Sequence, residues 1–365
     1  MSQDFYSWIT LNKAQFFFNA DYIKKQIGVQ VKLGAVIKSN AYGHGLLHIA
    51  QLCQESRSID VLIVFSLHDA LLLREKGILK PLILMGILDA PLQEVSEKNI
   101  DLVVHNRFFA ERLIIYAQQH QQKFRVHIKV DTGMNRLGFS PDELPNIIYL
   151  LKQSLYISIV GVCSHFAESE NVDTAFTLLQ LQRFDCLFSQ LNDLEYIHIS
   201  NTAGTLNFLN AHHSLVRCGG GLYGLDVPDK KLSLKPILSL KTKIIEIREV
   251  RPQCSVGYNR TFVANSMRKI AIVPLGYYDG LDRRLSNRGF MNIKGKVVPI
   301  IGRVAMNLTT LDVTDIPQVN IHDEVLVLGD GDLVTPAQYA HLLNTIEYEI
   351  TARLNPLIKR ILIER

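Results

Sequence analysis

Short apolar runs alternate with segments of helical pattern along the first two thirds of this 365-residue chain. Segments 66–76, 108–121 and 174–192 carry apolar residues at helical spacing. Because no Gly-x-Gly-x-x-Gly opens the first unit, the alternation predicts an α/β fold with a closed, TIM-type (β/α)8 barrel rather than an open doubly wound sheet. Eight runs are predicted as barrel strands: 31–37, 60–66, 81–85, 101–105, 124–130, 157–163, 196–199 and 215–217.

The pattern changes after Gly224, where short alternating runs and glycine-containing turns indicate a mostly β domain. A chain of this length is comfortable for two domains. We therefore expect a barrel domain over residues 1–228 and a mostly β domain over residues 229–365, with residues 1–10 able to pair into the second domain. The runs expected as strands outside the barrel are 7–11, 238–247, 270–274, 297–302 and 324–328, and helices are expected at 12–26, 335–343 and 345–354.

Charge and composition exclude several classes of partner. The net charge is +4, and the densest basic cluster, Arg283, Arg284 and Arg288, is too short to indicate nucleic-acid or membrane binding. No apolar run approaches the roughly 18 residues of a membrane span, and the amino terminus lacks the pattern of a secretory signal. Five cysteines without Cys-x-x-Cys pairs argue against a disulfide framework or a zinc site. We expect a cytoplasmic protein without a metal.

A lysine follows the first predicted strand directly. Lys38 stands at the end of the apolar run 31–37, where withdrawal from water lowers the pKa of an ammonium group. A neutral amine in a partly apolar mouth can form an imine with a carbonyl, so Lys38 is a candidate Schiff-base residue. For a lone lysine, the alternative is that the side chain merely extends from the strand end into solvent.

The residues around Lys38 carry a longer pattern. Residues 35–45 read Ala-Val-Ile-Lys-Ser-Asn-Ala-Tyr-Gly-His-Gly, which resembles the pyridoxal-phosphate lysine motif of the alanine racemases. The resemblance implies that Lys38 holds pyridoxal 5'-phosphate as a Schiff base, with Tyr42 near the cofactor phosphate. It covers nearly the full chain, and it is stronger in the barrel than toward the end.

Other reactive residues follow the predicted barrel strands. Lys38, Arg136, His165, Thr202 and Arg217 come after five different strands. The carboxyl ends of the strands of a (β/α)8 barrel meet at one rim, where such barrels carry their active sites. Each residue alone would more often be structural, but their convergence on one rim favours a functional site.

The last barrel strand leads into a run of glycines. Backbone N–H groups of Gly219 and Gly220 can surround an anion, and Thr202 can add a hydroxyl, which indicates a phosphate site. In the family resemblance Arg217 faces the pyridine nitrogen; because arginine only donates hydrogen bonds, that nitrogen stays unprotonated and the cofactor is a weaker electron sink. His165 would lie against the ring or bond to Arg217.

Racemisation, which the resemblance implies, needs a base on each face of the substrate Cα. Lys38 is the base for the D enantiomer. Residues 254–258 resemble the family's second catalytic tyrosine segment, so Tyr258 would exchange the proton of the L enantiomer from the partner subunit of a homodimer. Arg136, a planar fork, suits the substrate carboxylate, which the backbone of Met306 also reaches in the family. The alternative for Tyr258 is an ordinary surface aromatic residue.

The chain departs from its family at several positions. Ala305 and Asn307 stand where cysteine and aspartate are usual, Thr202 where serine is usual, and Gly220 where isoleucine is common. Pro356 stands where the closing family pattern has a tyrosine.

Two further positions bear on the site. If Pro356 lines the site, the hydroxyl group that the family's tyrosine contributes to the cofactor phosphate is missing, and the entrance to the site is wider than in the family. An aromatic residue such as Tyr348 could fill that gap. Lys129 lies at a position that some family members carbamylate to hold the substrate arginine.

We therefore expect a homodimeric, pyridoxal-phosphate-dependent racemase that interconverts L- and D-alanine and supplies D-alanine for cell-wall peptidoglycan. Its partners would be a small amino-acid substrate and a second copy of the chain, and neither nucleic acid nor membrane. One alternative is a racemase of wider range, acting on serine, lysine or similar side chains. Another is a non-catalytic, pyridoxal-phosphate-binding regulatory protein. A barrel decarboxylase is disfavoured because no Cys-Asp-Ser-type motif occurs late in the chain.

Overall fold

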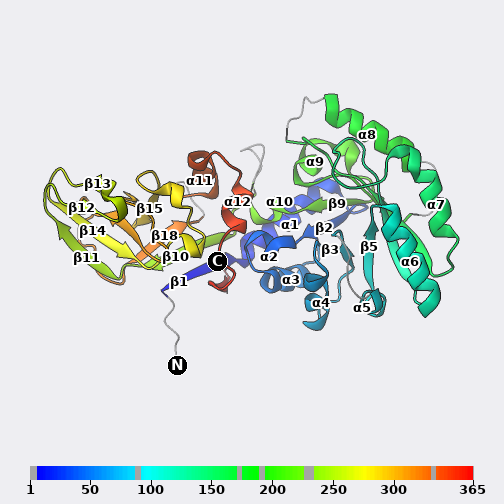
Figure 1. Ribbon diagram of the computed structural model, residues 1–365, viewed down its shortest axis with the longest axis horizontal. Helices are drawn as coiled ribbons and strands as arrows, with labels where there is room; N and C mark the ends of the chain where they lie inside the picture. Colours follow the sequence, from blue (N-terminus) through cyan, green and yellow to red (C-terminus); the bar gives the residue numbers. More distant parts are fainter. Residues whose placement is uncertain are drawn as a thin grey trace.

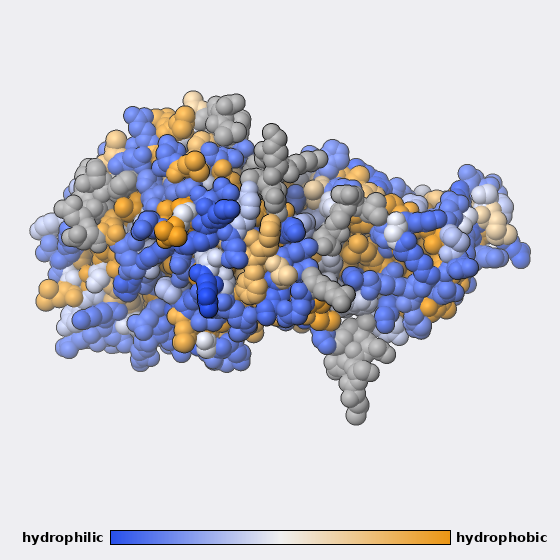
Figure 2. All heavy atoms as spheres, turned by 180° about the vertical axis from the view of Figure 1, so that it is seen from behind, coloured by the Kyte–Doolittle hydropathy of each residue, from blue (hydrophilic) through white to orange (hydrophobic). Residues whose placement is uncertain are grey.

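The computed structural model describes residues 6–86, 92–170, 175–188, 194–225, 234–329 and 334–364. They form two parts, one with helices around a parallel sheet and one composed mostly of strands (Figure 1). The predicted domain boundary near residue 228 and part of the predicted helix 174–192 lie outside the described residues. Hydrophilic residues predominate on the face in Figure 2, with apolar residues scattered over both parts.

The parallel sheet confirms the barrel prediction. All eight predicted strands are present, in the order β8-β7-β6-β5-β4-β3-β2-β9. Backbone hydrogen bonds from Ser214 to Ile197 (3.3 Å) and from Arg217 to Ser200 (3.0 Å) join the two outer strands, so the barrel is nearly closed. The strands are β2 (Lys32–Val36), β3 (Val61–Val64), β4 (Leu82–Leu84), β5 (Ile100–Val104), β6 (Phe124–Lys129), β7 (Ile157–Cys163), β8 (Tyr196–His198) and β9 (Leu215–Cys218).

Helices alternate with the barrel strands, and the longer ones bury apolar residues on one side. Asn12, Ser66 and Asn106 cap three of them, because each side chain accepts a hydrogen bond from a first-turn N–H group. The helices of this part are α1 (Lys13–Ile27), α2 (Lys38–Tyr42), α3 (Leu46–Glu55), α4 (Leu67–Glu75), α5 (Leu92–Glu97), α6 (Arg107–His120), α7 (Leu144–Lys152), α8 (Ala175–Phe188), α9 (Thr202–Asn207) and α10 (Gly220–Tyr223). In the part of the chain that the structure describes, no helix is both long and apolar enough to cross a membrane.

The second part is built on a six-stranded sheet in the order β16-β15-β18-β10-β1-β19. Strand β1 pairs antiparallel with β10 and parallel with β19, so the start and the end of the chain lie together in this sheet. Its strands are β1 (Ser7–Asn12), β10 (Leu238–Lys243), β15 (Phe290–Ile293), β16 (Lys296–Pro299), β18 (Glu324–Leu328) and β19 (Lys359–Ile363). Two smaller sheets contain β11 (Glu246–Val250), β14 (Arg268–Val273) and β17 (Thr309–Asp312), and β12 (Ser255–Val256) and β13 (Phe262–Val263).

The predicted strand 238–247 is wrong as a single element. The chain bends after β10, with the Ile244 side chain fully buried, and β11 then joins a different sheet. Strands β12, β13, β15, β17 and β19 were not predicted.

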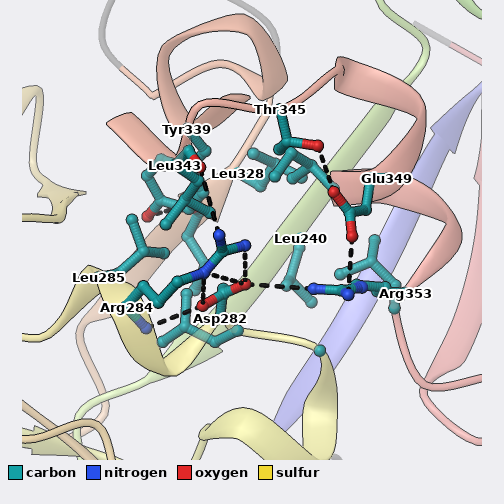
Figure 3. Close-up of a pocket in the computed structure, with 15 residues that line it drawn as sticks. Leu240, Asp282, Arg284, Leu285, Leu328, Tyr339, Leu343, Thr345, Glu349 and Arg353 are labelled. Atoms are coloured by element: carbon teal, nitrogen blue, oxygen red, sulfur yellow. Dashed lines mark hydrogen bonds and ion pairs between the residues drawn. The ribbon is translucent and has the colours of Figure 1, made fainter. Parts of the chain in front are cut away.

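Two helices, α11 (Pro336–Leu343) and α12 (Glu347–Ala352), pack against each other, and α12 also contacts the barrel part at α2. Asp282 lies between Arg284 and Arg353, at 2.8 and 3.2 Å, and Arg353 also pairs with Glu349 of α12 at 2.7 Å (Figure 3). A Cβ atom on Gly43, just after α2, would overlap the backbone of α12 at Thr351. Helix α12 is therefore held by the second part while it touches the barrel turn that follows Lys38.

Candidate active site

A cavity of about 640 Å³ opens where the barrel strands end. This volume lies within the range of cofactor and substrate sites. Eight of the ten predicted site residues line it, and two further residues from the sequence analysis, Lys129 and Tyr348, line it as well. The eight are Lys38, Tyr42, Arg136, His165, Thr202, Arg217, Gly219 and Gly220.

Lys38 faces this cavity from the end of β2. Desolvation by the surrounding protein, followed by the positive charges of Arg136 and Arg217, lowers the pKa of its ammonium group. A lysine with a lowered pKa holds more of its amine in the neutral form, which is the form that attacks a carbonyl carbon.

The turn after Lys38 is backbone-strained. Residues 39–42 all have φ between 51° and 55°, a left-handed conformation that costs roughly 1–2 kcal/mol for each non-glycine residue. The Asn40 side chain accepts from the Leu46 N–H at 2.8 Å, and the His44 ring contacts the Ala41 carbonyl oxygen at 2.9 Å. These contacts hold the turn, which brings the Tyr42 ring back over the cavity within 6.0 Å of the Lys38 Nζ atom.

Three hydroxyl groups surround the glycine run after β9. The Thr202 hydroxyl accepts from the N–H groups of Gly219 (3.2 Å) and Gly221 (3.3 Å). A Cβ atom on Gly219 would lie 2.6 Å from the Tyr42 hydroxyl, and one on Gly220 would overlap the Tyr348 hydroxyl. The absence of side chains at Gly219 and Gly220 leaves room for the two tyrosine rings, so backbone N–H groups and hydroxyl groups gather at one place, as an anion site requires.

Arg217 is buried at the other side of the cavity. Its guanidinium donates to the ring nitrogen Nδ1 of His165 and to that of His198, both at 2.9 Å. Burial, followed by the charge of Arg217, lowers the pKa of His165 well below its usual value, so the imidazole is neutral. The predicted bond between His165 and Arg217 is present.

Lys129 is the last residue of β6, and Arg136 follows this strand. The backbone N–H of Arg136 donates to the Asp131 carboxylate at 3.0 Å, which fixes the start of its segment, while its side chain lines the cavity. Lys129 is 7% exposed, and burial lowers the pKa of its ammonium group, with Arg217 and Arg136 adding to that effect and Cys163 opposing it.

Tyr258 and Met306 do not meet the other site residues within one chain. Their side chains are 68% and 55% exposed, and neither lines the cavity.

Sequence reasoning also left open whether Pro356 or Tyr348 lines the site. Pro356 is exposed and does not line the cavity, whereas Tyr348 does and packs edge-on against Tyr42 with ring centroids 5.3 Å apart. The pair Gly220 and Tyr348 could have indicated this in the sequence. Gly220 has no side chain, which makes room for the ring of Tyr348 at the cavity.

The site fits pyridoxal phosphate. It offers an amine for the aldehyde, a cradle of N–H and hydroxyl donors for the phosphate, and a guanidinium that only donates for the ring nitrogen. Among the described residues, no group of three or more His, Cys, Asp or Glu side chains could hold a metal ion.

Comparison with known proteins covers the whole chain. Residues 11–227 match the alanine racemase N-terminal domain family, and residues 237–362 match the alanine racemase C-terminal domain family. Alanine racemase 2 of Caldanaerobacter subterraneus subsp. tengcongensis is 35% identical, over 98% of this chain and 95% of its own length.

Solved structures agree. Alanine racemase of Clostridium difficile 630 superposes with a TM-score of 0.93 at 30% identity, covering 99% of this chain and 96% of the other. Alanine racemase of Bartonella henselae, described with covalently bound pyridoxal phosphate, gives a TM-score of 0.88 at 26% identity, covering 98% and 100%.

Fold and site together define a barrel-type pyridoxal-phosphate enzyme with a β domain attached. The full-length matches make the assignment specific: the chain belongs to the alanine racemase family.

Proposed function

We propose that this chain is an isomerase that interconverts L-alanine and D-alanine with pyridoxal phosphate as its cofactor. The observation that carries the proposal is the joint presence, in one cavity, of Lys38, Arg217 and the hydroxyl-lined glycine run, within a chain that matches alanine racemases over its full length. When bound, the cofactor supplies an electron sink for the pair of electrons left at the substrate Cα.

Lys38 and Tyr258 are the two proposed bases. The lowered pKa of Lys38 favours a neutral amine, which can take the Cα proton of D-alanine on one face. Tyr258 of a second copy returns a proton on the opposite face, and the two residues exchange these tasks for L-alanine. No net proton is gained or lost by the substrate in either direction.

Arg136 and Arg217 have separate proposed tasks. Arg136 binds the substrate carboxylate through its planar fork, together with a backbone group of Met306. Lys129, whose neutral amine is the form that reacts with carbon dioxide, is proposed to carry a carbamate that steadies Arg136. Arg217 faces the ring nitrogen and, since it gives up no proton at ordinary pH, keeps that nitrogen an acceptor.

Tyr42, Thr202, Tyr348, Gly219 and Gly220 are the proposed phosphate ligands. Their hydroxyl and N–H groups lie together around the glycine run that follows β9. His165 is proposed to contact the cofactor ring while it accepts from Arg217.

We propose a homodimer, which the exposed positions of Tyr258 and Met306 support. Two copies that exchange these residues complete two sites, as a closed two-fold arrangement allows. We propose domains at residues 1–228 and 229–365, with β1 of the first range paired into the sheet of the second domain and the barrel of one copy facing the β domain of the other.

We further propose that the enzyme acts in the cytoplasm and supplies D-alanine for cell-wall peptidoglycan. Full-length similarity to alanine racemases does not favour a non-catalytic regulatory protein, and it does not favour a wider substrate range.

The test is the circular-dichroism change of L-alanine, and separately of D-alanine, with enzyme and added pyridoxal phosphate. Both signals should decay to zero, and the cofactor should be required. A stable signal from either enantiomer would contradict the proposal, and faster turnover of L-serine or L-lysine would favour the racemase of wider range.

A further inference from the structure

A continuous line of polar side chains runs through the interior of the barrel, below the cavity. His198 Nδ1 accepts from Arg217 at 2.9 Å, His198 Nε2 contacts His127 Nδ1 at 3.0 Å, and His127 Nε2 contacts the Asp101 carboxylate at 3.4 Å. All four residues are at most 6% exposed. They come from strands β9, β8, β6 and β5.

Two features of the strands allow these side chains to meet: a glycine in β7 and a register shift between β6 and β7. His127 and His198 belong to strands separated by β7, so their rings meet across the position of Gly161. A Cβ atom on Gly161 would overlap the His127 ring, and the pairing of β6 with β7 shifts register between Val126 and His127. The ring of Tyr196 stacks on His127 with centroids 5.1 Å apart and fixes its plane.

Because Arg217 can only donate, it determines which ring nitrogen of His198 and of His127 carries the proton. Arginine has no acceptor, so His198 Nδ1 must be unprotonated and its proton must sit on Nε2. That N–H donates to His127 Nδ1, which must therefore be unprotonated too, so His127 is neutral and carries its proton on Nε2. This last N–H points at the carboxylate of Asp101. Every hydrogen bond is donated in the same direction, from Arg217 to Asp101.

The carboxylate at the far end is held ionised. Burial alone would raise the pKa of Asp101, but hydrogen bonds from His127 and Arg125 hold this pKa below its usual value. Arg125 binds both carboxylate oxygens, at 2.8 and 3.2 Å, and also reaches Glu195 at 2.8 Å. The line thus begins on a buried cation and ends on an anion at the opposite end of the barrel.

Arg217 needs such a line. Its hydrogen-bond partners are the carbonyl oxygens of Ser164 and Ile199 and the imidazoles of His165 and His198, and no carboxylate among the described residues pairs with it directly. A buried charge without compensation is costly, and polarised neutral imidazoles can transmit the field of a distant carboxylate.

We propose that Asp101 and His127 are positioning residues for the racemase reaction: through His198 they fix the guanidinium of Arg217 in place and compensate its charge. This inference rests on the proposed function, because it concerns how Arg217 meets the cofactor ring. Neither residue touches the cavity, so each acts only through the line.

The first test reads the protons directly in the holoenzyme. In protein labelled with ¹⁵N-histidine, His127 and His198 should each show an unprotonated Nδ1 and a protonated Nε2, with signals assigned by loss in His127→Gln. This reading does not depend on turnover, so it separates a failure of the inference from a failure of the proposed function. A proton on Nδ1 of either ring, or a doubly protonated His127, would overturn the inference.

The second test removes the anion. Asp101→Asn should lower kcat for alanine about tenfold, shift the visible absorbance band of the bound cofactor, and leave KM within about twofold, because a displaced guanidinium misplaces the ring but not Arg136. Asp60→Asn is the matched control: Asp60 pairs with Lys24 at 3.0 Å and lies off the line, so neither kcat nor the band should move.

A third variant guards against a folding defect in Asp101→Asn. Gly161→Ala keeps every polar group but displaces the His127 ring, and it should reproduce the band shift. An unchanged cofactor band and kcat in both variants, or equal changes in Asp60→Asn, would show that the line is structural only.

Discussion

The barrel rim and the face of the β domain that carries Tyr258 and Met306 differ in how complete they are. At the rim, residues from strands far apart in sequence converge on one cavity, and their contacts constrain one another. On the β domain, the two motif residues are more than half exposed. The difference teaches that one chain gathers the predicted cofactor residues in a single cavity, whereas the residue proposed to act on the opposite face lies outside that cavity.

The largest loss of racemisation should come from a substitution at the barrel rim. Lys38→Ala removes both the amine that holds the cofactor and one of the two bases, so racemisation should fall by at least about a thousandfold. The visible absorbance band of the bound cofactor should be lost as well. A coloured protein with full turnover would contradict the assignment of Lys38.

The second-largest loss of racemisation should come from a substitution on the face of the β domain. Tyr258→Phe removes one hydroxyl and should lower racemisation about 10²- to 10⁴-fold, while the absorbance titration with pyridoxal phosphate stays unchanged. Initial rates measured from L- and D-alanine test this. Rates equal to those of the unaltered enzyme in both directions would place the second base elsewhere.

A smaller effect, on the affinity for pyridoxal phosphate, tests which side chains bind the cofactor phosphate. Tyr348→Phe removes one hydrogen bond to a charged acceptor, worth about 1.5–3 kcal/mol, so the Kd for pyridoxal phosphate should rise at least about tenfold. Tyr223→Phe is the matched control, since that buried hydroxyl donates to the Val36 carbonyl oxygen at 2.9 Å and does not line the cavity. Equal changes in Kd for the two variants would remove Tyr348 from the phosphate site.

The smallest effect concerns Pro356. Since it is exposed and does not line the cavity, Pro356→Tyr should leave the Kd for pyridoxal phosphate and the alanine-to-serine rate ratio within about twofold. A larger shift in either quantity would mean that this position reaches the entrance in the assembled enzyme.

Sequence predicted the barrel well, because strands buried on both faces read as continuous apolar runs and occur in a regular alternation. It predicted the β domain less well. Strand β19 contains Lys359 and Arg360 and pairs with β1, whose sequence lies at the other end of the chain, so no local pattern indicated it.

The site shows the same division. Residues directly after barrel strands, such as Lys38 and Arg217, were predictable because the fold sends all strand ends to one rim. The line from Arg217 to Asp101 was not, since it depends on a register shift and on the missing side chain of Gly161. The left-handed turn after Lys38 was equally hidden, because Ser39 and Ala41 have no preference for that conformation.

The measurement that tests the central claim most directly is the activity of a mixed dimer. Lys38→Ala and Tyr258→Phe chains, each with a different tag, are co-expressed, and the dimer that carries both tags is purified. Such a dimer has one intact and one doubly defective site, so it should show about half the racemisation rate of the unaltered dimer, although each parent dimer is nearly inactive. A purified mixed dimer as inactive as its parents would contradict a site shared between two copies.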